Sequence, residues 1–255
     1  MNRKQLFIAY YTIVIKEMAR IFRIWPQTLI PPIITTSLYF VIFGKIIGER
    51  MNYIEGFRYI DFIAPGLIMM SIIINSFNNT VASFFGVKFQ KSIEELLTSP
   101  TPNYIIILGF TTGGVIRGCI NGLLMFFITL YFTNINFSSP LLAFYIMFCT
   151  SMFFSIAGII NAMYAKNFDD IAWIPSFIIT PLVYLSGVFY STNMMPLFWK
   201  KLLLFNPIYY FINVFRYSVL DIKSPYCYIT LVIMPILNLI IFFISLKLFD
   251  KKLKI

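Results

Sequence analysis

The sequence predicts an all-α integral membrane protein with six transmembrane helices, from its composition and from the distribution of its charges. Of its 255 residues, 59% are hydrophobic and 12% are charged, whereas soluble domains have roughly 45–50% apolar and about 25% charged residues. So few charges cannot cover a soluble surface. They are also separated by uncharged runs, and about 20 consecutive apolar residues suffice for a helix to cross a bilayer. We expect a single transmembrane domain over residues 1–255.

Residues 3–25 are predicted to form an amphipathic helix that lies at the membrane interface. Its basic residues share one helical face, opposite a face rich in aromatic residues, and this division is typical of interfacial helices. A signal peptide fits poorly because no small-residue cleavage site follows and charges lie on both sides of the apolar stretch. The basic face contains Lys16, Arg20 and Arg23, and the apolar face contains Phe7, Tyr11, Val14, Met18, Ile21 and Trp25.

Charge-free runs mark the six spans. Spans one, two, five and six are predicted at residues 24–44, 62–87, 171–199 and 224–246. The third and fourth share a long run around Arg117, which the turn-forming segment TNINFSSP at residues 133–140 divides.

A further apolar segment, residues 202–215, is too short to cross a bilayer. The dipeptide Asn206-Pro207 interrupts it, and a residue before proline disfavours helix. We therefore predict a re-entrant or interfacial hairpin before the last span. Asn206, Pro207 and Arg216 are expected to hold this outer hairpin rather than to bind cargo.

Six crossings place both termini on the same side of the membrane. Of the 20 Lys and Arg residues, twelve lie at the termini or in the loops after spans two and four, seven lie in the opposite loops, and Arg117 lies within a span. Cytoplasmic loops are enriched in Lys and Arg, so we expect cytoplasmic termini. The basic residues behind the net charge of +10 then set the orientation of the spans and contact anionic lipid. For this reason we expect no nucleic-acid partner.

The loop after the second span contains the segment KFQKSIEELLTSP, residues 88–100. Ser92 and Glu95 fit the capping box that begins many helices, and Pro100 would end the helix. Two interpretations remain open from these residues: a solvated turn between spans, or a docking helix that offers an apolar stripe to a partner. The apolar stripe consists of Phe89, Ile93, Leu96 and Leu97. The polar side of the helix consists of Lys88, Lys91, Glu94 and Glu95.

Four stretches resemble the type-2 ABC exporter permease family. They are FIAPGLIMMS (62–71), FQKSIEELLTSP (89–100), PLVYLSGVFYS (181–191) and NPIYYFINVFRY (206–217), and the resemblance covers nearly the whole chain. It implies a transport subunit of the bacterial inner membrane that pairs with a second copy of itself, each copy resting on a separate ABC ATPase subunit.

In this family the loop after the second span carries a coupling helix that fits a cleft on the ATPase. Carried over, Glu94 matches the family's acidic position, and Leu96, Leu97 and Pro100 match the end of the motif, whereas Glu95 stands where the family varies. The resemblance thus favours the docking interpretation of residues 88–100. The chain has no G-x-x-x-x-G-K-[ST] phosphate loop, so we expect no cofactor on this chain, with ATP on the partner subunit.

Arg117 is the one charged residue deep within a predicted span. Such a charge is costly in a membrane and is usually paired or functional. If spans two and three form a simple hairpin, Arg117 lies level with residues 71–75. Two roles for Arg117 remain open. It could form a structural bond to Asn75 or to a backbone carbonyl, or it could contact the substrate.

Other function classes fit the sequence less well. A passive channel or a non-ABC membrane assembly protein is the alternative to the exporter, and a channel would need no ATPase. A membrane-embedded enzyme is disfavoured because the sequence has no His and its carboxylates lie near span ends or in loops. We expect no catalytic residues and no metal site, and nothing in the sequence selects the transported substrate.

Overall fold

The computed structural model describes residues 2–48, 53–133, 135, 138–222 and 226–253, and most of these residues are helical. Within them, six helical segments are long and apolar enough to cross a membrane, which agrees with the predicted all-α membrane fold. They are Trp25–Gly44, Tyr59–Phe89, Asn103–Phe132, Pro140–Tyr164, Phe168–Leu185 and Cys227–Lys252.

Four of these spans are single helices and two change their helical winding. The first continues from α2 (Trp25–Tyr39) into the π-helical η1 (Phe40–Ile47). The fifth combines α7 (Phe168–Ile174), the π-helical η2 (Pro175–Ile179) and α8 (Thr180–Leu185). The single helices are α3 (Tyr59–Phe89), α5 (Asn103–Phe132), α6 (Pro140–Tyr164) and α11 (Cys227–Leu253).

The remaining elements are short connections and surface helices. Two short strands, β1 (Tyr53–Ile54) and β2 (Phe57–Arg58), pair antiparallel before α3. The other helices are α1 (Arg3–Arg23), α4 (Ile93–Thr98), the 3₁₀ turn η3 (Thr192–Met194), α9 (Leu197–Leu204) and α10 (Pro207–Leu220).

The fifth span is shorter than predicted. The uncharged run continues to Trp199, but α8 ends at Leu185, and Ser186 and Gly187 follow in a turn. Gly187 has a φ of +80°, a conformation that glycine adopts without steric cost. The prediction of one span over residues 171–199 is therefore wrong in its second half, because a backbone turn and not a charge ends the helix.

The predicted break between the third and fourth spans is confirmed, since α5 ends at Phe132 and α6 begins at Pro140. Residues 134, 136 and 137 of that break lie outside the described residues. The predicted start of the last span at residue 224 also lies outside them, and α11 begins at Cys227.

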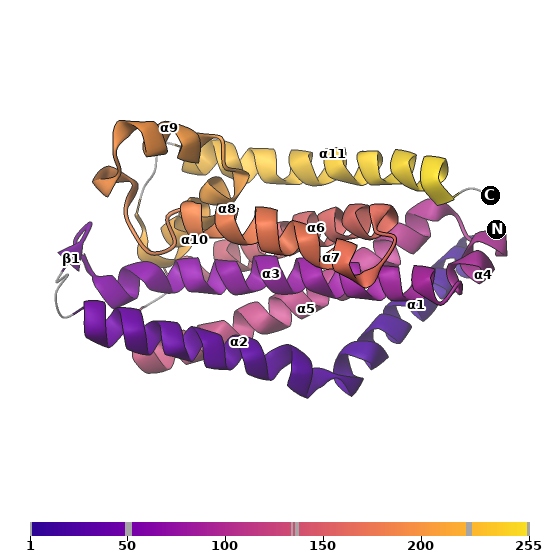
Figure 1. Ribbon diagram of the computed structural model, residues 1–255, viewed down its shortest axis with the longest axis horizontal. Helices are drawn as coiled ribbons and strands as arrows, with labels where there is room; N and C mark the ends of the chain where they lie inside the picture. Colours follow the sequence, from indigo (N-terminus) through magenta and orange to yellow (C-terminus); the bar gives the residue numbers. More distant parts are fainter. Residues whose placement is uncertain (1, 49–52, 134, 136–137, 223–225, 254–255) are drawn as a thin grey trace.

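The centre of the bundle is α3, which lies side by side with α5 and α6 (Figure 1). Glycines on α5 allow these helices to approach closely. A Cβ on Gly118 would lie 2.6 Å from the Ser151 hydroxyl oxygen of α6 and 3.0 Å from Ser76 Cβ of α3. Gly122 is similarly close to Ile72. Small residues at helix interfaces are the usual means of tight packing in membranes.

Several hydroxyl side chains inside the spans bond to carbonyl groups of their own helices. Ser76 donates to the Ile72 carbonyl at 2.7 Å, and Thr80 donates to the Ser76 carbonyl at 3.0 Å. In α5, Thr129 donates to the Met125 carbonyl at 2.8 Å. Because a hydrocarbon environment offers no hydrogen-bond partners, these local bonds allow polar residues to occupy the bundle interior.

The amphipathic α1 packs on α5 through a face that overlaps the predicted apolar face only at Ile21. Its buried residues are Ile13, Glu17 and Ile21, whereas Phe7 of the predicted apolar face is 67% exposed. Close approach is possible because Gly113 of α5 lies opposite Glu17, where a Cβ would lie 2.8 Å from the Glu17 Cβ. An exposed aromatic face is compatible with the predicted interfacial position, but the side of α1 that packs on the bundle is centred on Ile13 and Glu17.

Both chain termini and α4 lie at one end of the bundle, and β1 and α9 lie at the opposite end (Figure 1). A hydrophobic cluster joins the elements at the first end. It includes Phe84 of α3, Ile93 of α4, Phe110 of α5 and Phe249 of α11. The cluster also contains Ile159 of α6 and so connects α4 to four of the long helices.

A helical hairpin of α9 and α10 precedes the last span, where one was predicted. The two helices meet at Phe205 and Asn206, and α10 packs against α3, α6 and α11. The sequence placed the hairpin at residues 202–215, so it is longer than predicted on both sides. A re-entrant position of this hairpin in the membrane stays a prediction.

Candidate functional site

The short helix α4 follows α3 after a sharp change of direction. Lys91 has a φ of +59° in the connection. The capping box predicted for Ser92 and Glu95 is wrong, because Ser92 makes no side-chain bond to the first turn of α4. Its hydroxyl group instead donates to the Val87 carbonyl at 3.2 Å. The turn, and not a cap, therefore sets the start of this helix.

The predicted docking residues divide between two environments. Ile93 is 5% exposed and belongs to the hydrophobic cluster of the permease itself. Leu96 and Leu97 are half-buried and pack against the same cluster. The exposed residues are Phe89, Glu94, Glu95 and Pro100. One side of α4 thus anchors the helix to the bundle and the other side faces outward.

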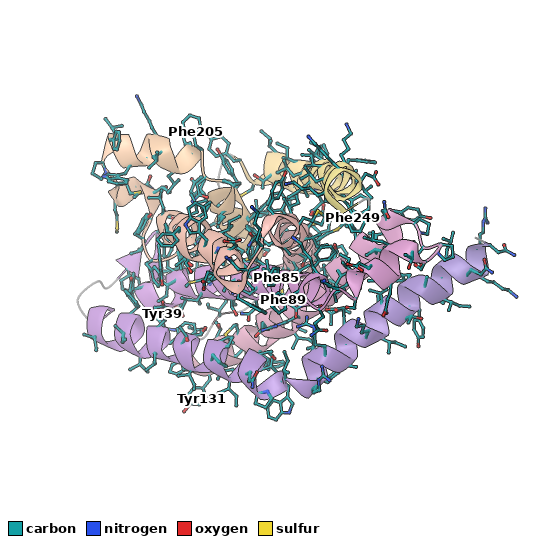
Figure 2. All side chains as sticks on the ribbon, turned by 45° about the vertical axis from the view of Figure 1, so that its right-hand side comes forward. Tyr39, Phe85, Phe89, Tyr131, Phe205 and Phe249 are labelled. Carbon is teal, nitrogen blue, oxygen red and sulfur yellow. The ribbon has the colours of Figure 1, made fainter. Side chains whose placement is uncertain are left out.

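A second loop extends this exposed surface. The Phe89 ring lies 4.8 Å from the ring of Phe168, at the start of α7, and both rings are exposed (Figure 2 labels Phe89). We call the exposed residues Phe89, Glu94, Glu95, Pro100 and Phe168 the α4 surface. Because Phe168 begins the fifth span, the α4 surface joins the loops after spans two and four.

Two polar residues near the α4 surface have structural contacts. The Lys88 ammonium group donates to the carbonyls of Met163 at 2.8 Å and Ala165 at 2.6 Å, at the C-terminal end of α6. Asp170 accepts from the Lys166 backbone at 2.8 Å and forms a capping box with Asn167. Cations stabilise the C-terminal end of a helix, so Lys88 ties α3 to α6.

Arg117 belongs to a polar cluster between α1, α3 and α5. Its guanidinium group donates to the Asn79 side-chain oxygen at 3.1 Å, and Arg20 donates to the same oxygen at 2.7 Å. Arg20 also forms a salt bridge with Glu17 at 2.9 Å. Glu17 in turn accepts a hydrogen bond from Ser83. The cluster connects the surface helix α1 to two spans.

The hydrogen-bond partner of Arg117 is Asn79, not Asn75, which the sequence had suggested. Asn75 donates to the Ser71 carbonyl of its own helix at 2.9 Å. The sequence also predicted Arg20 on the basic face of an interfacial helix, and it did not single out Glu17. A signal was present, because Glu17 and Arg20 stand three residues apart, the spacing of an intrahelical ion pair.

The residues predicted for the outer hairpin make contacts within the chain. Asn206 caps α10 by accepting from the Ile208 backbone at 3.0 Å, and its amide donates to the Leu182 carbonyl at 2.6 Å. Pro207 occupies the first turn of α10, where a missing N–H costs nothing. Arg216 is 5% exposed, donates to the Gly187 carbonyl at 2.8 Å and lies 4.0 Å over the Phe62 ring.

The comparisons with known proteins agree on one family. The family described as "ABC-2 type transporter" matches residues 8–220, which include the α4 surface, the polar cluster around Arg117 and the outer hairpin. The chain belongs to the ABC-2 type transporter family. This membership makes the chain a membrane transport permease and not itself an enzyme.

Two groups of ABC-2 relatives illustrate the range of similarity. The chain is 48% identical over 218 residues to "Inner membrane transport permease YadH" of Escherichia coli (strain K12), covering 86% of this chain and 85% of that protein. It is 23% identical over 219 residues to "Nodulation protein J" of Sinorhizobium fredii (strain NBRC 101917 / NGR234), covering 86% and 83%.

Proposed function

We propose that the chain is the membrane-spanning half of an ATP-driven exporter, which works as a dimer of this permease with two separate ATPase subunits. The α4 surface is the observation that carries the proposal. Charged and aromatic groups stand exposed together at the end of the bundle that holds both termini (Figure 1). Membership of the ABC-2 family supports an ABC ATPase as the partner, and ATP would bind to that partner.

The contacts behind the α4 surface suggest how a motor would act on the spans. Ile93 anchors α4 in the hydrophobic cluster, and Lys88 ties α3 to α6. Movement of the ATPase subunits during ATP binding would therefore press on α4 and shift α3 and α6 together. Such rigid-body movement of packed helices is the usual basis of alternating access.

Purification of the affinity-tagged permease from its native membrane tests the proposal. We expect an ABC ATPase subunit to co-purify with it, identified by mass spectrometry, and the complex to hydrolyse ATP. A gently solubilised, monodisperse permease that carries no ATPase, and conducts solute without ATP in vesicles, would instead identify a passive channel.

We further propose that the protein lies in a bacterial inner membrane with both termini in the cytoplasm. Its relative YadH is named as an inner membrane permease, and basic residues predominate on the side of the termini. Reporter fusions after Lys4, Lys91 and Lys166 should give a cytoplasmic signal. Fusions after Arg58 and Lys201 should report the opposite side. A cytoplasmic signal after Lys201 would refute the orientation.

A further inference from the structure

A groove of about 280 Å³ lies between α2 and α3, within the first two spans. Arg117 of α5 is one of the residues that line it. Other polar residues line the groove beside Arg117. They include Thr28, Thr35, Thr36, Ser71 and Asn75.

Arg117 brings a positive charge to this groove that its neighbours do not balance. The surrounding cluster contains two guanidinium groups, Arg20 and Arg117, and the single carboxylate of Glu17 forms its salt bridge with Arg20. Among the described residues, no carboxylate lies within ion-pair distance of Arg117, and its Nε atom is buried without a hydrogen-bond partner. The cluster therefore has a net charge of +1.

Arg117 is half-buried, and a positive charge without a counter-ion is costly in a medium of low polarity. An anionic group in the groove would supply the missing charge, and a phosphate or carboxylate matches the planar donors of a guanidinium group. Thr35, which is exposed, and Ser71 line the same groove, and hydroxyl side chains can donate hydrogen bonds to an anion. The chemistry of the lining thus selects an anion over a cation.

The rest of the lining is apolar, which indicates an amphipath rather than a free ion. Pro31, Pro32, Leu67, Met70 and Ile74 line the groove together with the polar residues. The groove also lies between spans, where an alkyl chain is in a favourable environment. An alkyl chain and an anionic headgroup would each find matching surface here.

We infer that the groove between α2 and α3 binds an amphipathic molecule through an anionic headgroup, with Arg117 as its counter-ion. The inference rests on the proposed function, because it assigns the class of cargo to a site of the exporter. Arg117 then serves two purposes: it bonds Asn79 within the cluster and it attracts the headgroup.

The test measures binding to the full-length permease in phosphatidylcholine nanodiscs. One sample contains a pyrene-labelled dodecyl phosphate and a matched sample a pyrene-labelled dodecyltrimethylammonium. Energy transfer from the tryptophans reports proximity, and Trp25 stands at the start of α2 beside the groove residues Gln27 and Thr28. We expect greater transfer to the phosphate probe, and competition by unlabelled dodecyl phosphate but not by inorganic phosphate.

Substitutions distinguish the effect of the Arg117 charge from the effect of the groove shape. Arg117→Gln should weaken binding of the phosphate probe at least tenfold, since a charge-assisted hydrogen bond is lost, and Arg117→Lys should restore part of it. Thr35→Phe fills the groove without touching the polar cluster and should also abolish the preference. Ile34→Phe is the matched control, because Ile34 is exposed on the same helix and does not line the groove.

Several outcomes would overturn the inference. They are equal transfer to the two probes, competition by inorganic phosphate as strong as by dodecyl phosphate, or unchanged binding in Thr35→Phe. Thr35→Phe decides the matter if Arg117→Gln does not fold. The proposed function is refuted by a different result. If the permease binds the phosphate probe but binds no ATPase, the anion site stands and the exporter function is refuted.

Discussion

Gly118→Ala should destabilise the helix bundle by about 1–3 kcal/mol, the usual cost of forcing an extra carbon into a packed core. The new Cβ would meet Ser151 Oγ at 2.6 Å and Ser76 Cβ at 3.0 Å, so α5 must move away from both neighbours. We expect a lower midpoint of thermal unfolding in a neutral detergent, and a larger loss for Gly118→Val.

A matched control is available on α3. A Cβ on Gly86 would meet nothing within 4 Å, so Gly86→Ala adds the same carbon without a steric conflict. It should leave stability unchanged or raise it by up to about 1 kcal/mol, because alanine favours helix over glycine. If the two variants unfold at the same temperature, the glycine contacts of α5 do not govern the packing of the bundle.

Phe89→Asp should weaken binding of the proposed ATPase by about 2 kcal/mol or more, roughly 30-fold, because a large aromatic anchor would be replaced by a charge in the interface. Phe89 is 58% exposed, so the permease itself should still fold. Leu96 and Leu97 are weaker choices for this test, since both pack partly against the hydrophobic cluster and their loss would also affect stability.

The measurement is the amount of ATPase that co-purifies per folded, monodisperse permease. Phe205→Asp is the control, because Phe205 is 86% exposed and lies far from Phe89, near the hairpin of α9 and α10 (Figure 2). It introduces the same charge and should leave ATPase binding unchanged. Equal retention of ATPase by the two variants would show that the α4 surface is not the docking site.

The membrane fold was predictable because the signals for it are local. The thickness of the bilayer sets the length of a span, so uncharged runs, divided at the turn-forming segment of residues 133–140, indicated six spans. The motif around residues 88–100 indicated the family, to which the chain belongs. The end of the fifth span was less predictable, because the turn at Gly187 lies inside an uncharged run.

The sequence by itself determined that the chain is an integral membrane permease, how many spans it has, and where a docking helix is expected. Only the tertiary structure decided which side of each helix meets which neighbour. Glu17 is buried because Gly113, far along the chain, leaves room for it. Arg117 bonds Asn79 because α3 and α5 pack together at the level of these two residues. Span length depends on a solvent that is the same for every helix, whereas packing depends on the shapes of two particular surfaces distant in sequence.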